Sequence, residues 1–255
     1  MRLGLALSLA SWAPSSVATF DPTTLSLTGW WRGSFTASPW VGVASADSSG
    51  SHNLSEATNP PSSGTAVDTY HPASFDGTND KLAGAALSSF FSSSAYSMAA
   101  LINVTSFTGA DPGASAPYSC ASLLASGADG ASGTQCGGPA GTGASGVFRY
   151  GHHDGAWKSD SVAIATSTWV MVKVAFDGSH IKVGKNNTAF GAGTAAGNVG
   201  AALTPNLEIG RDGLNTIFTN TQVLDAITSS SALTSTNFNN YYSYLKARYP
   251  SAGLP

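Results

Sequence analysis

Charged residues are scarce in this chain of 255 residues, since Asp, Glu, Lys and Arg together make up 10% of it. An average soluble protein has about 25%. The formal net charge is −3, and the 11 Lys and Arg residues are scattered along the chain. Because nucleic acids and anionic membranes are bound through clustered positive charge, neither is expected as a partner.

Long apolar runs are missing as well. No stretch approaches the roughly 20 consecutive apolar residues that a membrane-spanning helix needs. Gly, Ser, Ala and Thr take up the positions that charged residues leave. This composition is typical of a β-rich protein with many turns and few helices.

Cysteine is limited to Cys120 and Cys136. Both lie in a segment rich in Gly, Ala, Ser and Pro, which a disulfide between them would stabilise. Free thiols fit equally well, because two cysteines do not establish the redox compartment. Neither belongs to a CxxC motif, and no His or Cys is spaced to complete a zinc site.

Residues 168–184 (TWVMVKVAFDGSHIKVG) carry the strongest structural signal in the chain. Valines alternate with other residues up to Phe176, and such alternation sends successive side chains to opposite faces of a strand. The valine-containing face is expected to meet a core, and the other face a second layer or water. Asp177 and Gly178 then provide a tight turn. The segment predicts a central β-hairpin in an all-β domain.

Further strands are expected elsewhere in the chain. A second hairpin is predicted at 147–161, around a turn at Asp154 and Gly155. Residues 109–146 are predicted to be the least structured part, because they are rich in Gly, Ala, Ser and Pro. Single strands are predicted at 20–35, 97–104, 206–211 and 217–228.

The last part of the chain predicts one helix. Its apolar residues recur every three or four positions. Ser235 or Thr236 is suited to cap its start, and Pro250 to stop it. The apolar stripe consists of Phe238, Tyr241, Tyr242, Leu245 and Tyr249.

Residues 1–19 favour an extended arm that precedes the domain at 20–255. Leu3, Leu5, Leu7 and Leu9 alternate with small residues, as in a strand. Such an arm needs a sheet edge to pair with, for example on a neighbouring subunit. One basic residue and a short apolar run also resemble a secretory signal peptide, which stays open as the alternative.

The ordered motifs resemble a known family. They are FDGTND at 75–80, W-x-V-x-V-x-F-D-G at 169–178, LEIGRDG at 207–213 and the short closing helix. In this order they are similar to the concanavalin A-like lectin/glucanase superfamily, in its laminin-G-like branch. The resemblance implies an all-β fold in which two antiparallel sheets pack face to face as a jelly-roll sandwich.

The resemblance also bears on metals and cofactors. Relatives often hold calcium with Asp side chains and backbone carbonyls at the rim of the sandwich. Asp76 and Asp80 are the metal candidates that follow from it, with Asp154 and Asp212 as further Asp residues near turns. Apart from calcium, no cofactor is expected.

The positions of the carboxylate residues indicate whether the chain carries the catalytic motif of a glucanase. The superfamily contains retaining glucanases, whose two carboxyl groups lie about 5–5.5 Å apart. Related glucanases place them on one strand as E-x-D-x-x-E. The chain has two glutamates, Glu56 and Glu208, and neither belongs to such a motif. We therefore expect the protein not to be an enzyme.

Sugar contacts are expected from aromatic and polar side chains on the concave face or the loop rim, because flat rings stack well on sugars. Neighbouring strand residues point to opposite faces, so His152 and His153 are not expected to line one site together. The candidates are Trp40, Tyr150, His152 and Trp157.

These features predict a non-enzymatic virion surface protein of a tailed bacteriophage, such as a capsid decoration, head fibre or tail component, whose jelly roll binds host glycans. The alternating arm, the low charge density and the similarity of the MRLGL opening to phage structural proteins favour it. Its expected partners are other virion proteins or copies of itself, joined through the arm, and host surface polysaccharide. The alternative is a secreted bacterial carbohydrate-binding lectin module, and a glycoside hydrolase is least favoured.

Overall fold

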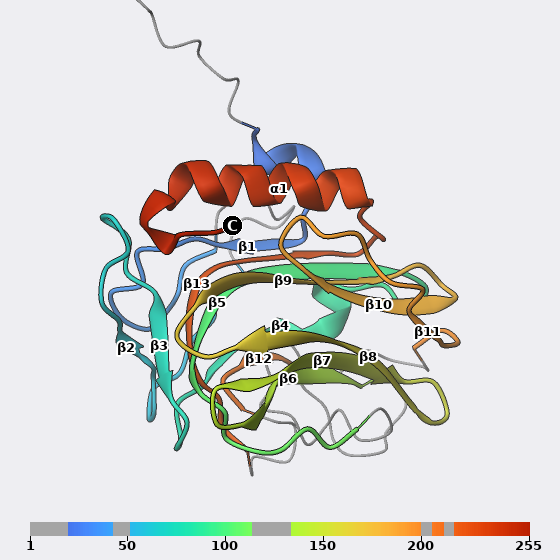
Figure 1. Ribbon diagram of the computed structural model, residues 1–255, viewed down its shortest axis with the longest axis horizontal. Helices are drawn as coiled ribbons and strands as arrows, with labels where there is room; N and C mark the ends of the chain where they lie inside the picture. The colour runs from blue at the N-terminus through green and yellow to red at the C-terminus, as the bar shows by residue number, and fades with distance from the viewer. Residues whose placement is uncertain (1–19, 43–51, 114–133, 200–205, 212–216) are drawn as a thin grey trace, which may run out of the picture.

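The computed structural model describes residues 20–42, 52–113, 134–199, 206–211 and 217–255. Within these residues an eight-stranded antiparallel sheet runs in the order β11-β10-β9-β5-β13-β3-β2, and β1 also pairs with β13 (Figure 1). Its strands are β1 (Gly29–Trp31), β2 (Ser62–Ser63), β3 (Ala73–Asp76), β5 (Tyr96–Ser106), β9 (Trp169–Phe176), β10 (His180–Lys185), β11 (Thr194–Ala195) and β13 (Asn220–Ser229).

A second layer faces this main sheet. It contains the three-stranded sheet β6-β7-β8 and the pair β12-β4. Its strands are β4 (Leu82–Ala86), β6 (Gln135–Thr142), β7 (Ser145–His153), β8 (Trp157–Ala165) and β12 (Asn206–Ile209). The all-β jelly-roll sandwich expected from the sequence is confirmed.

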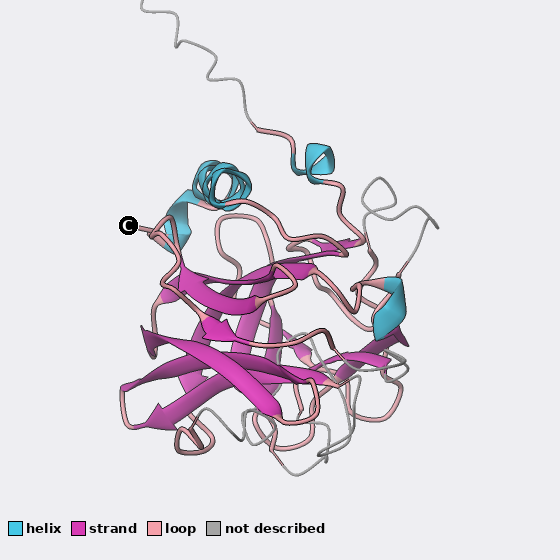
Figure 2. Ribbon diagram, turned by 90° about the vertical axis from the view of Figure 1, so that its right-hand side faces the viewer, coloured by secondary structure: helices cyan, strands magenta, loops and turns pink. Residues whose placement is uncertain are grey.

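A helix covers the other face of the main sheet. Helix α1 (Ser235–Arg248) lies across it, on the side away from β6, β7 and β8 (Figure 1). Figure 2, which looks along α1, shows the helix stacked above the strands. Three short 3-10 helices complete the described elements: η1 (Pro22–Leu25), η2 (Leu87–Ser89) and η4 (Pro250–Ala252).

The hairpin predicted at 168–184 is confirmed as β9 and β10. Ile181 pairs with Phe176, and Gly178 has a φ of 90° in the turn. Val172, Val174 and Phe176 belong to the core between the two sheets. Met171 and Ala175 belong to the second core, under α1. Both faces of the strand are therefore buried, so the second layer that the sequence left open is the helix.

Lys173 is the polar exception on the helix side of β9. Its side chain is buried, and Nζ donates to the carbonyl of Thr188 at 2.6 Å. Nζ also lies 4.8 Å from the ring centre of Phe190 and 5.8 Å from that of Phe238. Burial lowers the pKa of this ammonium to about 8. The two rings and the carbonyl partly replace the water that the charge has lost.

The second hairpin, predicted at 147–161, is confirmed as β7 and β8, with the turn at Asp154 and Gly155. The predicted strands at 97–104, 206–211 and 217–228 correspond to β5, β12 and β13 with small shifts of their ends.

The prediction for 109–146 is wrong where it includes β6. This strand reads QCGGPAGT and pairs with β7 along its whole length. A Cβ on Gly137 would lie 2.1 Å from the carbonyl oxygen of Arg149. The glycines that suggested a loop are thus required by close backbone approach within a strand.

The prediction of one strand at 20–35 is also wrong in extent. Asp21 caps the 3-10 helix η1 by accepting a hydrogen bond from Thr23 N at 3.0 Å, and only β1 is extended. Trp30 and Trp31 do lie on opposite faces: Trp30 is under α1, and Trp31 is between the sheets.

Some expectations fall outside the described residues. These are the arm with Leu3, Leu5, Leu7 and Leu9, the residue Asp212, and the pairing of Cys120 with Cys136. The division into an arm and one domain stays a prediction. In the described part of the chain, no helix is long and apolar enough to cross a membrane.

The start of α1 differs from the sequence prediction. The cap is Thr234, whose Oγ1 accepts from Asn237 N at 3.2 Å, and the Asn237 side chain accepts from Thr234 N at 2.9 Å. The predicted caps Ser235 and Thr236 lie inside the first turn. Reciprocal bonds of this kind satisfy two backbone donors that the helix leaves unpaired.

We predict that Thr234→Ala lowers the free energy of unfolding by about 1 kcal/mol, because the first turn loses this cap. Urea unfolding followed by circular dichroism measures the change. The matched control is Thr236→Ala, an exposed position in the same turn, which should change stability by less than about 0.5 kcal/mol. Equal effects of the two substitutions would contradict the assigned cap.

Candidate functional site

Three of the four predicted sugar contacts lie in the protein core. Trp40, Tyr150 and His152 are 3%, 0% and 0% exposed. Trp40 Nε1 donates to the carbonyl of Arg32 at 2.9 Å, and the Tyr150 hydroxyl donates to Gln135 Oε1 at 3.1 Å. Tyr150 and His152 are fully buried and present no face to a sugar, whereas the edge of Trp40 lines a surface hollow together with Arg32 and Arg248.

Trp157 is partly buried and packs against the core between the sheets. Its ring meets that of His153 edge to face at 5.5 Å. It lies at the β7–β8 turn, and the structure brings none of the other three candidates to the surface beside it.

His152 is held as a neutral imidazole between the two layers. Its Nδ1 lies 3.0 Å from the Tyr96 hydroxyl, and its Nε2 lies 2.9 Å from the carbonyl of Gly197. Because a carbonyl can only accept, Nε2 carries the proton and Nδ1 accepts from Tyr96. Burial lowers the pKa of His152 to about 4.

The metal candidates Asp76 and Asp80 form a turn. Asp76 Oδ1 accepts from Thr78 N at 2.7 Å, and Asp80 Oδ2 accepts from Asp76 N at 2.9 Å. Across the described ranges, no group of three or more His, Cys, Asp or Glu side chains is placed to hold a metal ion. The turn accounts for both carboxylates, and calcium stays a prediction.

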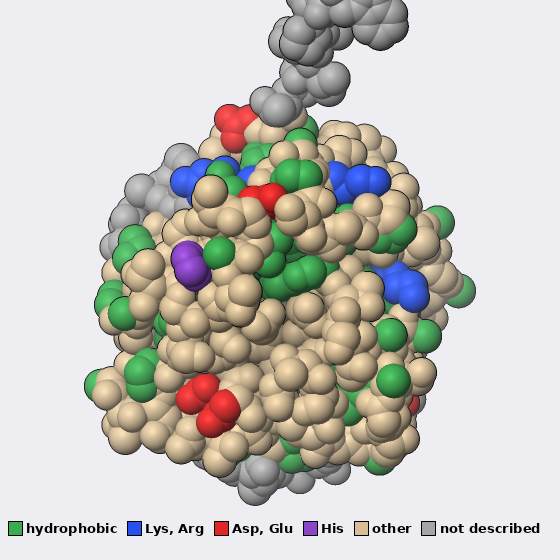
Figure 3. Space-filling view, turned by 60° about the vertical axis from the view of Figure 1, so that its left-hand side comes forward, with side chains coloured by type: hydrophobic (Ala, Val, Ile, Leu, Met, Phe, Trp, Pro, Cys, Tyr) green, Lys and Arg blue, Asp and Glu red, His purple; other side chains and the backbone are tan. Residues whose placement is uncertain are grey.

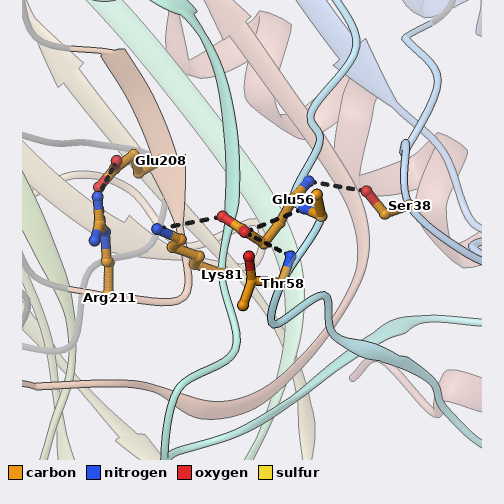
Figure 4. Close-up of polar contacts among 7 residues, drawn as sticks. Ser38, Glu56, Thr58, Lys81, Glu208 and Arg211 are labelled. Carbon is orange, nitrogen blue, oxygen red and sulfur yellow. Dashed lines mark hydrogen bonds and ion pairs between the residues drawn. The ribbon is translucent and has the colours of Figure 1, made fainter.

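The two glutamates lie on opposite sides of β4, Glu56 in a loop segment and Glu208 in β12. Ala83 bridges to Ser55 on one side and pairs with Glu208 on the other, which brings Glu56 and Glu208 into one region (Figure 4). This arrangement could not be predicted from the sequence, because β12 lies far along the chain from Glu56 and pairs with β4 only in the folded protein.

Each of these carboxylates has a cationic partner. Glu56 Oε2 lies 3.2 Å from Lys81 Nζ, and Arg211 donates to both oxygens of Glu208, at 2.6 and 2.8 Å (Figure 4). A hydrogen bond from Thr58 N is the main cause that lowers the pKa of Glu56. Retaining glycosidases need one carboxyl group with a raised pKa as proton donor. Glu56 is therefore poorly suited to that role.

A hollow of the surface lies elsewhere, at the C-terminal end of α1. Three adjoining hollows, of about 500, 370 and 310 Å³, all include Arg248 in their walls. Arg32 lines the first two, and Tyr244 lines the last two. We call this surface the arginine groove. Its other lining residues include Asp21, Trp30, Ala37, Trp40, Val41 and Tyr70.

Two elements position the arginines. Trp30 lies in β1 and Arg32 directly follows this strand, and the guanidinium of Arg32 lies over the Trp30 ring. Tyr244 and Arg248 are four residues apart on α1 and so share one side of the helix. The pairing of β1 with β13 sets the strand beneath the helix. Figure 3 shows one side of the molecule, where Lys and Arg side chains lie on both sides of a group of hydrophobic and acidic side chains in the upper part of the view.

Both guanidinium groups lie on aromatic rings. Arg32 Cζ is 4.7 Å from the ring centre of Trp30, and Arg248 Cζ is 4.3 Å from that of Tyr70. Arg248 Nε donates to the Tyr249 hydroxyl at 3.2 Å. Neither arginine forms an ion pair with another described residue. Stacking covers a flat face of each guanidinium and leaves its N–H edge for other partners.

A buried carboxylate lies beneath the groove. Asp225 accepts hydrogen bonds from Trp30 Nε1 at 2.9 Å, from the Tyr241 hydroxyl at 2.6 Å and from the Tyr249 hydroxyl at 2.8 Å. Burial raises the pKa of Asp225 to about 6, and the three donors oppose this rise. Tyr249 thereby links Asp225 to Arg248 in the wall above it.

A further feature favours a ligand in the groove. The Tyr244 hydroxyl is buried beside the Arg32 side chain; burial raises the pKa of Tyr244 to about 12, and the contact with Arg32 opposes this rise. Val41 is 60% exposed and is the one large hydrophobic side chain classed as exposed in the described part of the chain. The groove thus combines polar donors with apolar surface, as small-ligand sites do.

Sequence reasoning missed this groove. The pairs Trp30/Arg32 and Tyr244/Arg248 have the spacings of residues that share one face of a strand or a helix, which was a usable signal. Nothing in the sequence indicated that the two pairs meet, because β1 is the first described strand and α1 follows the last one in the chain.

Comparisons with known proteins give structural neighbours only. No family model and no curated protein matches the chain. The structure of Trypanosoma rangeli sialidase in complex with sialic acid is similar with a TM-score of 0.54 at 14% identity, over 86% of this chain and 33% of that one. The chain therefore spans about a third of the sialidase.

Two other neighbours have similar scores. A structure of botulinum neurotoxin type C, a toxin whose cell entry depends on interaction with two ganglioside molecules, has a TM-score of 0.54 at 11% identity, over 86% of this chain and 51% of that one. Domain 4 of AbnA, a GH43 extracellular arabinanase of Geobacillus stearothermophilus, in complex with arabinotriose, has a TM-score of 0.51 at 15% identity, over 76% and 90%. At these identities the likeness shows the β-sandwich fold.

The neutral state of His152 predicts a pH dependence of stability. Its pKa is about 4 in the folded protein against 6.5 for an ordinary histidine, so the unfolded chain takes up the proton first as the pH falls. The stabilisation is complete above pH 6.5 and is lost toward pH 4, by about 3 kcal/mol in all.

The experiment compares urea unfolding of the wild type and of His152→Gln at several pH values between 7 and 4. We expect the wild type to lose more stability over this range than the variant. His180→Gln, on partly exposed β10, is the control and should follow the wild type. Parallel curves for the wild type and His152→Gln would contradict the assigned protonation state.

Proposed function

We propose that this chain is a non-enzymatic carbohydrate-binding β-sandwich domain and that the arginine groove binds the sugar. The observation that carries the proposal is the groove itself: two ring-stacked guanidinium groups and exposed Val41 line one connected hollow. Guanidinium N–H groups donate to sugar hydroxyls, and apolar surface packs against the C–H faces of a sugar ring.

The structural neighbours support the same class of ligand. The sialidase and arabinanase structures hold sialic acid and arabinotriose, and the neurotoxin interacts with gangliosides. The fold alone does not assign a function, because unrelated functions share it. The proposal therefore rests on the groove, and the neighbours agree with it.

The absence of enzymatic activity is part of the proposal. It is supported by the ion pairs of Glu56 with Lys81 and of Glu208 with Arg211. Both carboxylates are thus already engaged by a cation. The virion role and the location on a virion or outside the cell stay predictions, and the arm meant to join the chain to its partners lies outside the described residues.

The binding proposal predicts that filling the groove abolishes sugar binding. Ala37 is exposed and lines the largest of the three hollows, so Ala37→Trp should occupy it. We expect the wild type to bind a subset of glycans on an array, and Ala37→Trp to bind them at least about tenfold more weakly, a loss of about 1.4 kcal/mol.

The matched control is Ala192→Trp, at an exposed position outside the groove, which should bind as the wild type does. Thermal unfolding confirms that both variants are folded. The proposal fails if the wild type binds no glycan on the array, or if Ala37→Trp and Ala192→Trp bind equally well.

The non-enzymatic part predicts that the wild type releases no reducing sugar from the glycans that it binds. Reducing-end assays over a day, with a glycosidase as positive control, make the measurement. Hydrolysis that disappears in Glu56→Gln or Glu208→Gln would show that the paired carboxylates are catalytic and would contradict this part.

A further inference from the structure

The charge of the arginine groove differs from that of the whole chain. The net charge is −3, yet Arg32 and Arg248 both line the two largest of the three hollows. The exposed acid in these walls is Asp21, whose Oδ1 already caps η1. Asp225 is buried beneath and is occupied by three donors. The groove thus offers the N–H donors of two guanidinium groups to a ligand. Its exposed carboxylate, that of Asp21, is already partly occupied by the cap of η1.

Ring stacking orients these guanidinium groups. Trp30 and Tyr70 each cover one flat side of an arginine, at 4.7 and 4.3 Å from Cζ to the ring centre. The N–H donors lie in the plane of the guanidinium and are therefore not covered by the ring. For Arg248, the hydrogen bond from Nε to Tyr249 further restricts rotation. A guanidinium group whose paired N–H donors are held in one orientation suits a planar anion with two oxygens.

Tyr244 lies beside both arginines, and both lower the pKa of its hydroxyl while burial raises it. Its ring packs edge to face on Trp30 at 5.8 Å and stacks on Tyr241 at 6.0 Å. This rigid aromatic base joins the hollow on the Arg32 side to the hollow on the Tyr70 side. A ligand in the groove therefore meets both cations on one platform.

We infer that the arginine groove selects a sugar residue that carries a carboxylate, such as a uronic or sialic acid, with the carboxylate at the guanidinium edges and the ring beside the aromatic side chains. This inference rests on the proposed function and names its ligand class. A densely sulfated chain fits less well, because such polyanions need a run of cations, and the 11 Lys and Arg residues are scattered through 255 positions.

The test uses matched pairs of glycans. Each pair consists of a uronic- or sialic-acid-terminated oligosaccharide and its carboxyl-reduced, neutral counterpart, and a sulfated oligosaccharide of similar length is added. We expect the wild type to bind the carboxylated member at least about tenfold more tightly than the neutral member, since hydrogen bonds to charged groups contribute about 1.5–3 kcal/mol. Isothermal titration at constant ionic strength gives the ratio.

The variants Arg32→Gln and Arg248→Gln remove one charge each. In both we expect the ratio of carboxylated to neutral affinity to fall toward one. Arg248→Lys keeps the positive charge but loses the paired N–H donors of the guanidinium group. It should give an intermediate ratio of carboxylated to neutral affinity. The control is Lys182→Gln on β10, whose lysine pairs with Asp177 outside the groove, and it should keep the ratio of the wild type. Circular dichroism and thermal unfolding confirm that each variant is folded.

The outcomes separate this inference from the proposed function. Equal binding of both members of a pair, lost in Ala37→Trp, would overturn the acidic selectivity and leave the sugar site standing. Tighter binding of the sulfated probe than of any carboxylated one would overturn the assignment of a carboxylate. Binding of no probe at all would overturn both.

Discussion

The carboxylate of Asp225 is the interaction on which the rest of the groove depends. Burying an ionised group costs a great deal of free energy unless hydrogen bonds replace its water. Here Trp30 from β1, together with Tyr241 and Tyr249 from α1 and its C-terminal cap, makes those bonds. One side chain of β13 thus ties the helix to the strand beside it. Tyr244 and Arg248 lie on the same helix, so their places beside Trp30 and Arg32 follow from this anchor.

The covered main sheet explains where a ligand can bind. Strands β5, β9 and β13 are buried on both faces, by the opposing layer on one side and by α1 on the other. A sugar cannot lie along the open face of such a sheet. The available surface is at the ends of the covering elements, and the arginine groove lies where α1 ends.

Local patterns predicted much of the fold, because strand alternation and Asp-Gly turns are encoded within a few residues. The hairpin at 168–184 followed from them. Strand β6 could not be predicted, because glycine is normally rare in strands. Here Gly137 is required because the backbone of Arg149 on the neighbouring strand lies too close for a side chain. Tyr150 was predicted as a sugar contact and is fully buried, because large rings fill a core more often than they cover a surface. The groove requires contacts between distant segments, which no local pattern reveals.

The construction of the groove has a consequence for protein synthesis. Its walls combine β1, near the start of the described domain, with α1, which follows every described strand in the chain. Chains emerge from the ribosome in order, so the sheets can associate while α1 is still being made. Until α1 docks, Trp30 and Asp225 lack their cover and the apolar face of the main sheet is exposed. The arginine groove is therefore among the last features of the described domain to form.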